Sequence, residues 1–176
     1  LDDHAPLAEA LAVGEPVLLV YIVEPILLNN AHYRGRHWHF IAQSLDDINR
    51  KLARFGAEVV ILEGSAPELL ATLHKTFPFQ RLLSYEETGL AVTFERDRDV
   101  TKIAQQCRFV WQESPTNGIE RGRTNRRGWS RRWAQIMSSP IRTTDLNRLA
   151  ELCIDTPSTL EASRCQRINR WRQQHK

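Results

Sequence analysis

Hydrophobic and polar positions follow two different patterns along the chain. Residues 16–23 form an unbroken apolar run rich in leucine and β-branched residues, which is typical of a strand buried on both faces of a parallel sheet. Between residues 38 and 55 the apolar positions recur every three or four residues, with charged and amide side chains between them. That spacing predicts a long amphipathic helix, and Gly56 is its expected stop.

The same alternation repeats further along the chain. Apolar runs at 57–63, 81–85 and 107–111 predict three more strands. Helices are expected from Ser65, which has Glu68 three residues later in a capping-box arrangement, and over 90–106. Four strand–helix alternations favour an α/β fold, a three-layer Rossmann-like parallel sheet with helices on both faces. Its ligand crevice should lie beyond the carboxyl ends of the strands.

The expected domain organisation is one core with appended segments, because 176 residues are too few for two domains of ordinary size. We expect the α/β domain over 1–112 and a connector over 113–156. The connector contains a short helix at 128–137 with Trp129, Trp133 and Met137 four residues apart. Residues 157–176 are polar and basic, and are expected to be a linker or the start of a further domain.

Composition narrows the class of protein. Apolar residues make up 41% and charged residues 26%, which excludes collagen-like and wholly disordered chains. The longest apolar run is far shorter than the ~20 residues that cross a bilayer, and the first residues lack the basic start of a signal peptide. We therefore expect a cytoplasmic protein with no membrane partner. Three cysteines without a C-x-x-C spacing indicate reduced thiols rather than a disulfide framework or structural zinc.

Charge is distributed unevenly. Residues 1–100 contain 9 Lys/Arg and 15 Asp/Glu, a net −6, whereas residues 101–176 contain 15 and 6, a net +9. Six arginines lie between residues 121 and 132. Guanidinium groups pair well with phosphate and with carboxylate. The cluster therefore predicts contact either with nucleic acid or with the acidic first hundred residues of the same chain.

Candidate site residues come from the predicted strand ends. Glu24 follows the first strand, and Glu86 and Glu87 follow the third. They are candidates for ligand binding, although adjacent carboxylates at a loop start are also commonly solvated or helix-capping. His37 and His39 point to different sides of a helix, so no metal site is expected there. The chain has no P-loop, G-x-G-x-x-G or G-x-S-x-G motif.

Several segments, taken in order, resemble the N-terminal α/β domain of the DNA photolyase and cryptochrome family. Residues 1–7 (LDDHAPL) resemble the end of the family's opening motif, and Tyr-Ile-Val-Glu-Pro at 21–25 resembles its second strand end. The helix from Arg36 to Gly56 is similar to the family's long helix. Ser84–Gly89 with Arg96–Val100 resemble the family's fourth strand and the helix that follows it. Gly118–Arg121 and Arg127–Pro140 are similar to the connector of one bacterial branch of the family.

The resemblance implies a domain that binds an antenna chromophore (folate, deazaflavin, lumazine or FMN) at a crevice near Glu24, Glu86 and Glu87. It also implies a partner domain, helical and absent from this sequence, that holds FAD. In photolyases the excited reduced flavin donates an electron to a pyrimidine dimer in DNA, so these residues alone would not be catalytic. The alternatives are a blue-light-sensing cryptochrome without repair activity and a stand-alone nucleotide-binding α/β domain.

The resemblance further implies that the family's first strand, central in its sheet, is missing, because the sequence starts within the turn that follows it. Loss of a central strand would leave two rows of unpaired backbone groups. We therefore expect that the molecule has an additional N-terminal piece, or that another chain supplies the strand.

Overall fold

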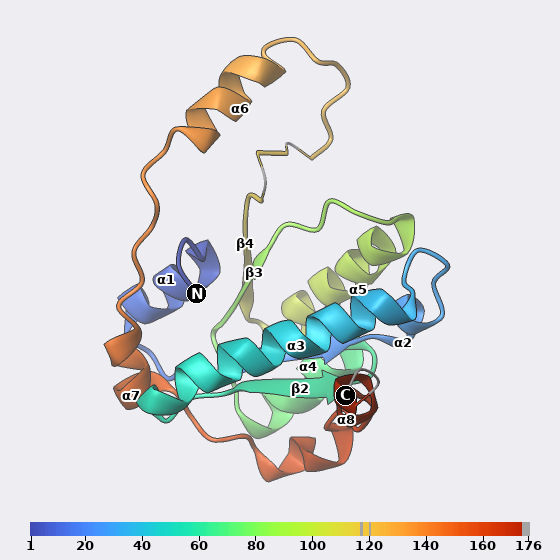
Figure 1. Ribbon diagram of the computed structural model, residues 1–176, viewed down its shortest axis with the longest axis vertical. Helices are drawn as coiled ribbons and strands as arrows, with labels where there is room; N and C mark the ends of the chain where they lie inside the picture. The colour runs from blue at the N-terminus through green and yellow to red at the C-terminus, as the bar shows by residue number, and fades with distance from the viewer. Residues whose placement is uncertain (117, 120, 174–176) are drawn as a thin grey trace. The chain divides into compact units, whose positions relative to one another are not determined.

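The computed structural model describes residues 1–116, 118, 119 and 121–173 (Figure 1). Its strands are β1 (Leu19–Val23), β2 (Val59–Glu63), β3 (Arg81–Tyr85) and β4 (Val110–Ser114). The helices are α1 (Ala5–Val13), α2 (Pro25–Leu28), α3 (Gly35–Leu52), α4 (Ala66–Thr76), α5 (Ala91–Cys107), α6 (Trp129–Met137), α7 (Leu149–Leu152) and α8 (Arg167–Gln173), with 3-10 turns η1 (Ala53–Phe55), η2 (Leu146–Arg148) and η3 (Ser158–Ser163).

The chain forms two compact units. One contains Leu1–Val13 and Phe79–Asp145, and the other contains Gly14–Pro78 and Leu146–Lys176. We call them the β3–β4 unit and the β1–β2 unit. The domain boundaries at 112 and 156 that the sequence suggests stay a prediction. Among the helices described, none is long and apolar enough to cross a membrane.

The β1–β2 unit is built on a parallel strand pair in which Leu19 is in register with Val59 and Val23 with Glu63. Helix α3 packs against β2 and buries four side chains, namely Trp38, Ala42, Leu45 and Leu52. The predicted amphipathic helix is confirmed, although it starts at Gly35. Its positive-φ stop at Gly56 (φ 68°) comes after the short turn η1, at a position where glycine adopts this conformation without strain.

The C-terminal segment is part of this unit. Leu160 in η3 is fully buried, and Cys165 and Ile168 belong to the core cluster around Trp38. Trp171 in α8 stacks on Trp38, with ring centroids 5.0 Å apart and planes 18° apart. Among the described residues up to 173, a few apolar side chains of this segment thus fill the core of the unit. That this segment leads into a further domain stays a prediction.

The β3–β4 unit has a second parallel pair, in which Arg81 is in register with Val110 and Tyr85 with Ser114. Helix α1 lies against both strands, and α5 packs against β4. The Tyr85 hydroxyl accepts a hydrogen bond from the Ala5 N–H at 2.9 Å and donates one to the Asp3 carbonyl at 3.1 Å. The first residues of the chain are thereby fixed at the end of β3.

The fourth strand lies further along the chain than predicted. Residues 107–111 suggested it, but α5 continues through Cys107 and ends at Arg108, whose backbone is left-handed (φ 63°). The strand begins only at Val110. The helix takes up Cys107, the first residue of the run that resembled a strand, and β4 continues beyond the end of that run, so Glu113 lies inside β4.

The α/β class with parallel strands and packed helices is confirmed. The described strands form two separate pairs rather than the single sheet expected, with orders β1–β2 and β3–β4. The absent first strand stays a prediction.

Replacing Leu160 with Ala tests the structural role of the C-terminal segment. Because Leu160 is fully buried, the substitution should lower the free energy of unfolding by about 2–5 kcal/mol. Thr159→Ala, at the exposed neighbouring position, should change it by less than about 0.5 kcal/mol. Urea unfolding followed by circular dichroism measures both. Equal stability of the two variants would show that η3 is not part of the core.

Candidate functional site

Glu24 lies directly after β1, as predicted, but its carboxylate serves the fold. The residue is only 3% exposed, and Oε1 accepts a hydrogen bond of 3.3 Å from the Ala66 N–H in the first turn of α4. A carboxylate at a helix N-terminus satisfies an unpaired amide and interacts favourably with the helix dipole. Ser65, expected to cap this helix, makes no such side-chain bond. The predicted capping box is therefore wrong, and Glu24 takes its place.

Glu86 and Glu87 lie in the β3–β4 unit, so the described contacts do not join them to Glu24. Glu86 extends the strand pairing through its backbone, since its N–H donates to the Ser114 carbonyl at 2.9 Å. Glu87 Oε1 accepts a 2.6 Å hydrogen bond from the Gly89 N–H, and Oε2 lies 3.6 Å from an Arg96 nitrogen. Glu87 thus leads to a charged cluster, and the charge of Glu86 also acts on one member of that cluster, Glu113.

That cluster is centred on Arg121. Its Nε donates to the Glu87 carbonyl at 2.7 Å, and its Nη1 and Nη2 donate to Glu113 Oε2 at 2.9 Å and Asp97 Oδ2 at 2.8 Å. The planar guanidinium therefore joins three elements, namely the loop after β3, strand β4 and helix α5, and it lies 5.4 Å from the Phe94 ring centroid. A fork of fixed donors suits such a role better than a lysine ammonium would.

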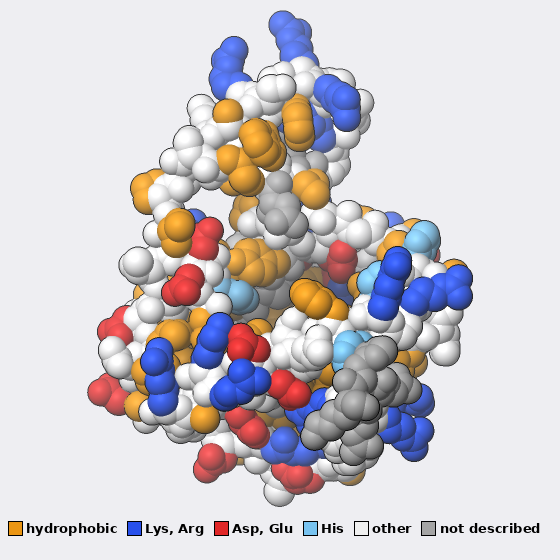
Figure 2. Space-filling view, in the orientation of Figure 1, with side chains coloured by type: hydrophobic (Ala, Val, Ile, Leu, Met, Phe, Trp, Pro, Cys, Tyr) orange, Lys and Arg blue, Asp and Glu red, His pale blue; other side chains and the backbone are white. Residues whose placement is uncertain are grey.

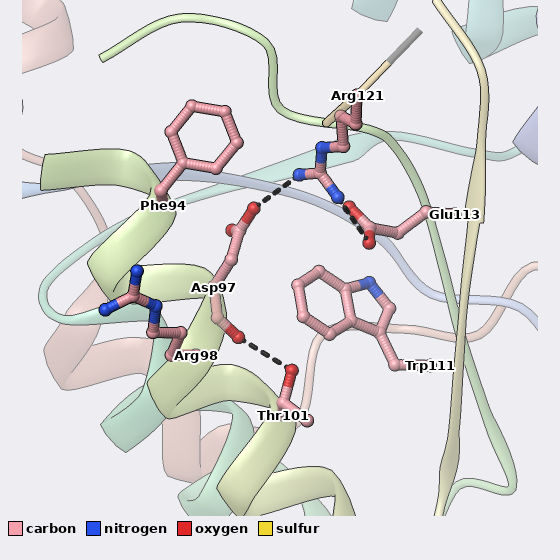
Figure 3. Close-up of a pocket in the computed structure, with 7 residues that line it drawn as sticks. All are labelled: Phe94, Asp97, Arg98, Thr101, Trp111, Glu113 and Arg121. Carbon is pink, nitrogen blue, oxygen red and sulfur yellow. Dashed lines mark hydrogen bonds and ion pairs between the residues drawn. The ribbon is translucent and has the colours of Figure 1, made fainter. Parts of the chain in front are cut away.

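A cavity of about 280 Å³ opens beside this cluster (Figure 3). Its lining combines two aromatic rings with charged and polar groups: Phe94, Asp97, Arg98, Thr101, Trp111, Glu113 and Arg121. The Trp111 indole N–H donates to Ser84 Oγ at 3.0 Å, which fixes the ring's orientation on β4. Figure 3 shows Phe94 and Asp97 projecting from α5 and Trp111 and Glu113 from β4, with Arg121 between the two acids.

The cavity's electrostatics are dominated by the paired acids. Burial raises the pKa of Glu113 above its ordinary value, opposed by Arg121 and reinforced by the charges of Asp97 and Glu86. Burial alone would lower the pKa of Arg121, but the hydrogen bonds and charges of Glu113 and Asp97 raise it. Glu113 Oε1 is buried and has no hydrogen-bond partner among the described residues. It is an acceptor available to a ligand that brings an N–H or O–H group.

Sequence reasoning missed the acids of this site. Asp97 is 8% exposed and lies on the face of α5 that buries Thr93, Val100 and Ala104. The helical spacing of Asp97 relative to apolar positions indicates a buried carboxylate. A buried carboxylate requires a cationic partner, since an isolated buried charge is costly. In the sequence, Arg121 is one of the six clustered arginines between residues 121 and 132, and nothing there distinguishes it from the other five. For Arg121 the predicted contact with the chain's own acidic residues is confirmed.

His37 and His39 are used separately. His37 Nδ1 accepts a hydrogen bond from the Arg34 N–H at 3.0 Å at the start of α3. His39 Nδ1 lies 2.7 Å from the Trp171 carbonyl. Each ring is thus engaged in local structure of the β1–β2 unit.

Comparison with known proteins identifies the family. The family model described as DNA photolyase matches residues 1–118. The chain belongs to the DNA photolyase family. Among curated relatives, it is similar to a chloroplastic/mitochondrial cryptochrome DASH of Solanum lycopersicum, with 28% identity over 92 residues, which are 49% of this chain and 16% of that protein. Cryptochrome-2 of Gallus gallus is 24% identical over 107 residues, 61% of this chain and 18% of that protein.

Solved structures of this family share the fold. A photolyase from Sulfolobus tokodaii matches with a TM-score of 0.64 at 17% identity, covering 81% of this chain and 33% of that one. A cryptochrome from Synechocystis matches with a TM-score of 0.57 at 19% identity, covering 64% of this chain and 24% of that one. The chain thus spans a third or less of the length of these family members.

Replacing Arg121 with Met should destabilise the protein, because Asp97 and Glu113 would lose their shared cation. Loss of one partner of a buried pair costs ~3–5 kcal/mol, and we expect about 1–3 here because the Arg121 side chain is 27% exposed. Adding Asp97→Asn should recover part of the loss. Arg126→Met, at an exposed position, is the control. Chemical unfolding measures the free energy of unfolding of each variant. Equal values for Arg121→Met and Arg126→Met would contradict the structural role of Arg121.

The raised pKa of Glu113 predicts a pH dependence. An acid whose pKa is raised by folding holds its proton more tightly in the native state, so its contribution to stability falls as pH rises from the unfolded pKa through the folded one. The stability of the wild type relative to Glu113→Gln should therefore decline as pH rises from 4.5. Thermal unfolding of both proteins at matched pH values measures the difference. If the stability of the wild type relative to Glu113→Gln increased with pH, the pKa of Glu113 would be lowered by folding rather than raised.

Proposed function

We propose that this chain is the antenna-chromophore-binding domain of a DNA photolyase, and that the cavity between α5 and β4 receives the chromophore. The observation that carries the proposal is the lining of that cavity: Phe94 and Trp111 offer apolar ring surface, while Glu113 and Arg121 offer polar groups at one side. Planar heteroaromatic ligands require this combination, an apolar slot with a few placed hydrogen-bonding groups.

The cavity's size favours a ring system over a whole dinucleotide. Its volume of about 280 Å³ lies just below the ~300–1,000 Å³ usual for ligand pockets. A pterin, lumazine, deazaflavin or flavin ring would enter, and its N–H groups could donate to Glu113 Oε1. The Sulfolobus tokodaii photolyase was crystallised with two FAD molecules, with the implication of a novel light-harvesting cofactor, which supports a flavin as one candidate.

The whole protein is part of the same proposal. FAD would be held by a helical domain outside these residues, and that domain and DNA would be the partners of this one. Excitation would pass from the antenna to FAD, which would then repair a pyrimidine dimer in the cytoplasm. Glu87 contributes to the site through its carbonyl, which orients Arg121. Glu24 and Glu86 act through capping and strand pairing in this proposal, not through contact with the chromophore.

A second candidate function is blue-light sensing without repair. It is supported by the names of three similar proteins, two curated relatives and one solved structure, all cryptochromes. The antenna proposal is common to both functions. Light-dependent conversion of thymine dimers in an oligonucleotide by the full-length protein separates them, since a sensing protein leaves the dimers intact.

Titration of the 176-residue chain with FMN, FAD, lumazine, a deazaflavin and a reduced folate tests the antenna site. At least one should bind and quench tryptophan fluorescence, and Trp111→Ala should weaken that binding about tenfold or more, since stacking contributes ~1–3 kcal/mol per ring. Trp129→Ala, an exposed tryptophan of the same unit, is the matched control. Binding of none of the five, or equal binding by Trp111→Ala, would contradict the proposal.

A further inference from the structure

The segment after the chromophore cavity carries a dense positive charge. Residues 122–144 include six arginines and no acidic residue. Arg126, Arg127, Arg131 and Arg132 are all exposed. A stretch of this kind attracts a polyanion, because no carboxylate of its own neutralises the field.

Contacts within the segment leave much of this charge unpaired. Arg121 is fully engaged by Asp97 and Glu113. The Arg123 guanidinium donates to the backbone carbonyls of Asn125 and Arg127, which shapes the loop before α6. In the described ranges, no ion pair involves Arg126, Arg127 or Arg131. Arg121 is therefore structural, whereas Arg126, Arg127 and Arg131 are exposed and available to an external anion.

Helix α6 adds aromatic surface to the charge. Its side chains Trp129, Trp133 and Met137 follow one another four residues apart and are 40%, 43% and 49% exposed. The two indole rings lie near parallel, 25° apart in plane with centroids separated by 6.3 Å. No residue of α6 is buried. Figure 2 shows hydrophobic side chains gathered over α6 with Lys and Arg side chains around them.

One side of this stripe is already covered. A Cβ added at Gly118 would lie 3.2 Å from Trp133 Cδ1 and 3.6 Å from Met137 Cε, so the chain backbone passes close to these side chains. Gly118 has a φ of +65°, a conformation that glycine adopts without strain. The backbone thus supports the rings from one side, while their remaining surface stays accessible.

We propose that the loop at 122–128 and helix α6 form a binding surface for single-stranded nucleic acid. Phosphates would contact Arg126, Arg127 and Arg131, and unpaired bases would stack on Trp129 and Trp133. This pairing of a basic track with aromatic platforms is how proteins hold single strands without sequence preference. Protein interfaces are also enriched in arginine, tryptophan and methionine. Here, however, residues 122–144 contain six arginines and no acidic residue, and a net positive field of this kind favours a polyanion over a protein partner. The surface is distinct from the chromophore cavity and needs no chromophore.

The test uses a fluorescein-labelled oligo(dT) strand and the 176-residue chain without added chromophore. Anisotropy should show binding that weakens as salt rises, with a log–log slope of about −0.7 per phosphate contact. The variant Arg126→Glu/Arg127→Glu/Arg131→Glu should lose at least about tenfold in affinity and reduce the slope by about 2. Trp129→Ala/Trp133→Ala should lose about tenfold or more with the slope unchanged.

The control is Arg36→Glu/Arg54→Glu/Lys75→Glu, the same change of charge at exposed positions of the β1–β2 unit. Its affinity should fall less than that of the first variant, and circular dichroism should show that all variants remain folded. Four results would overturn the proposal: no binding by the wild type, equal loss in both charge variants, tighter binding of duplex than of the single strand, or equal binding of polyglutamate or phosphatidylglycerol vesicles.

Discussion

The Arg121 guanidinium is the interaction on which the β3–β4 unit depends most. It donates hydrogen bonds to a carbonyl of the loop after β3, a carboxylate of β4 and a carboxylate of α5. Without this cation, Asp97 and Glu113 would face each other across a poorly solvated cavity and repel. With it, the spacing of α5 and β4 is fixed and the cavity between Phe94 and Trp111 has a defined polar side. Under the proposed function, stability and chromophore binding are therefore coupled through one side chain.

Arg121 begins the basic segment, and its charge is paired in a different way from that of the arginines that follow it. At residue 121 the charge is satisfied within the fold, whereas a few residues later it is directed to solvent beside exposed tryptophans. In the β1–β2 unit, Glu24 is likewise satisfied internally, by the first turn of α4. The position of a charged residue at a strand end or in a cluster does not by itself show that the residue is functional. The groups it contacts in the fold show whether its charge is already paired.

Much of the fold could be predicted from the sequence because local periodicity determines it. The strand expected at 81–85 is present at Arg81–Tyr85, and the helix expected at 128–137 is present at Trp129–Met137. Among the elements that the sequence did not predict, two were missed for opposite reasons. Helix α1 is so uniformly apolar that it has no polar face to reveal its period, and α8 has too few apolar positions to predict that Trp171 would stack on Trp38. Of the candidate site, the strand-end rule points to Glu87. Asp97 and Glu113 join it through their ion pairs with Arg121, and these contacts are hidden by the distance between the residues in the sequence.

The central claim is that the Arg121-organised cavity holds a planar chromophore. A crystal structure of the chain grown with whichever chromophore binds most tightly tests it most directly. The account predicts ring density between Phe94 and Trp111, with a ring N–H within hydrogen-bond distance of Glu113 Oε1 and the Arg121 contacts to Asp97 and Glu113 intact. A chromophore ordered elsewhere on the chain, with this cavity empty, would contradict it.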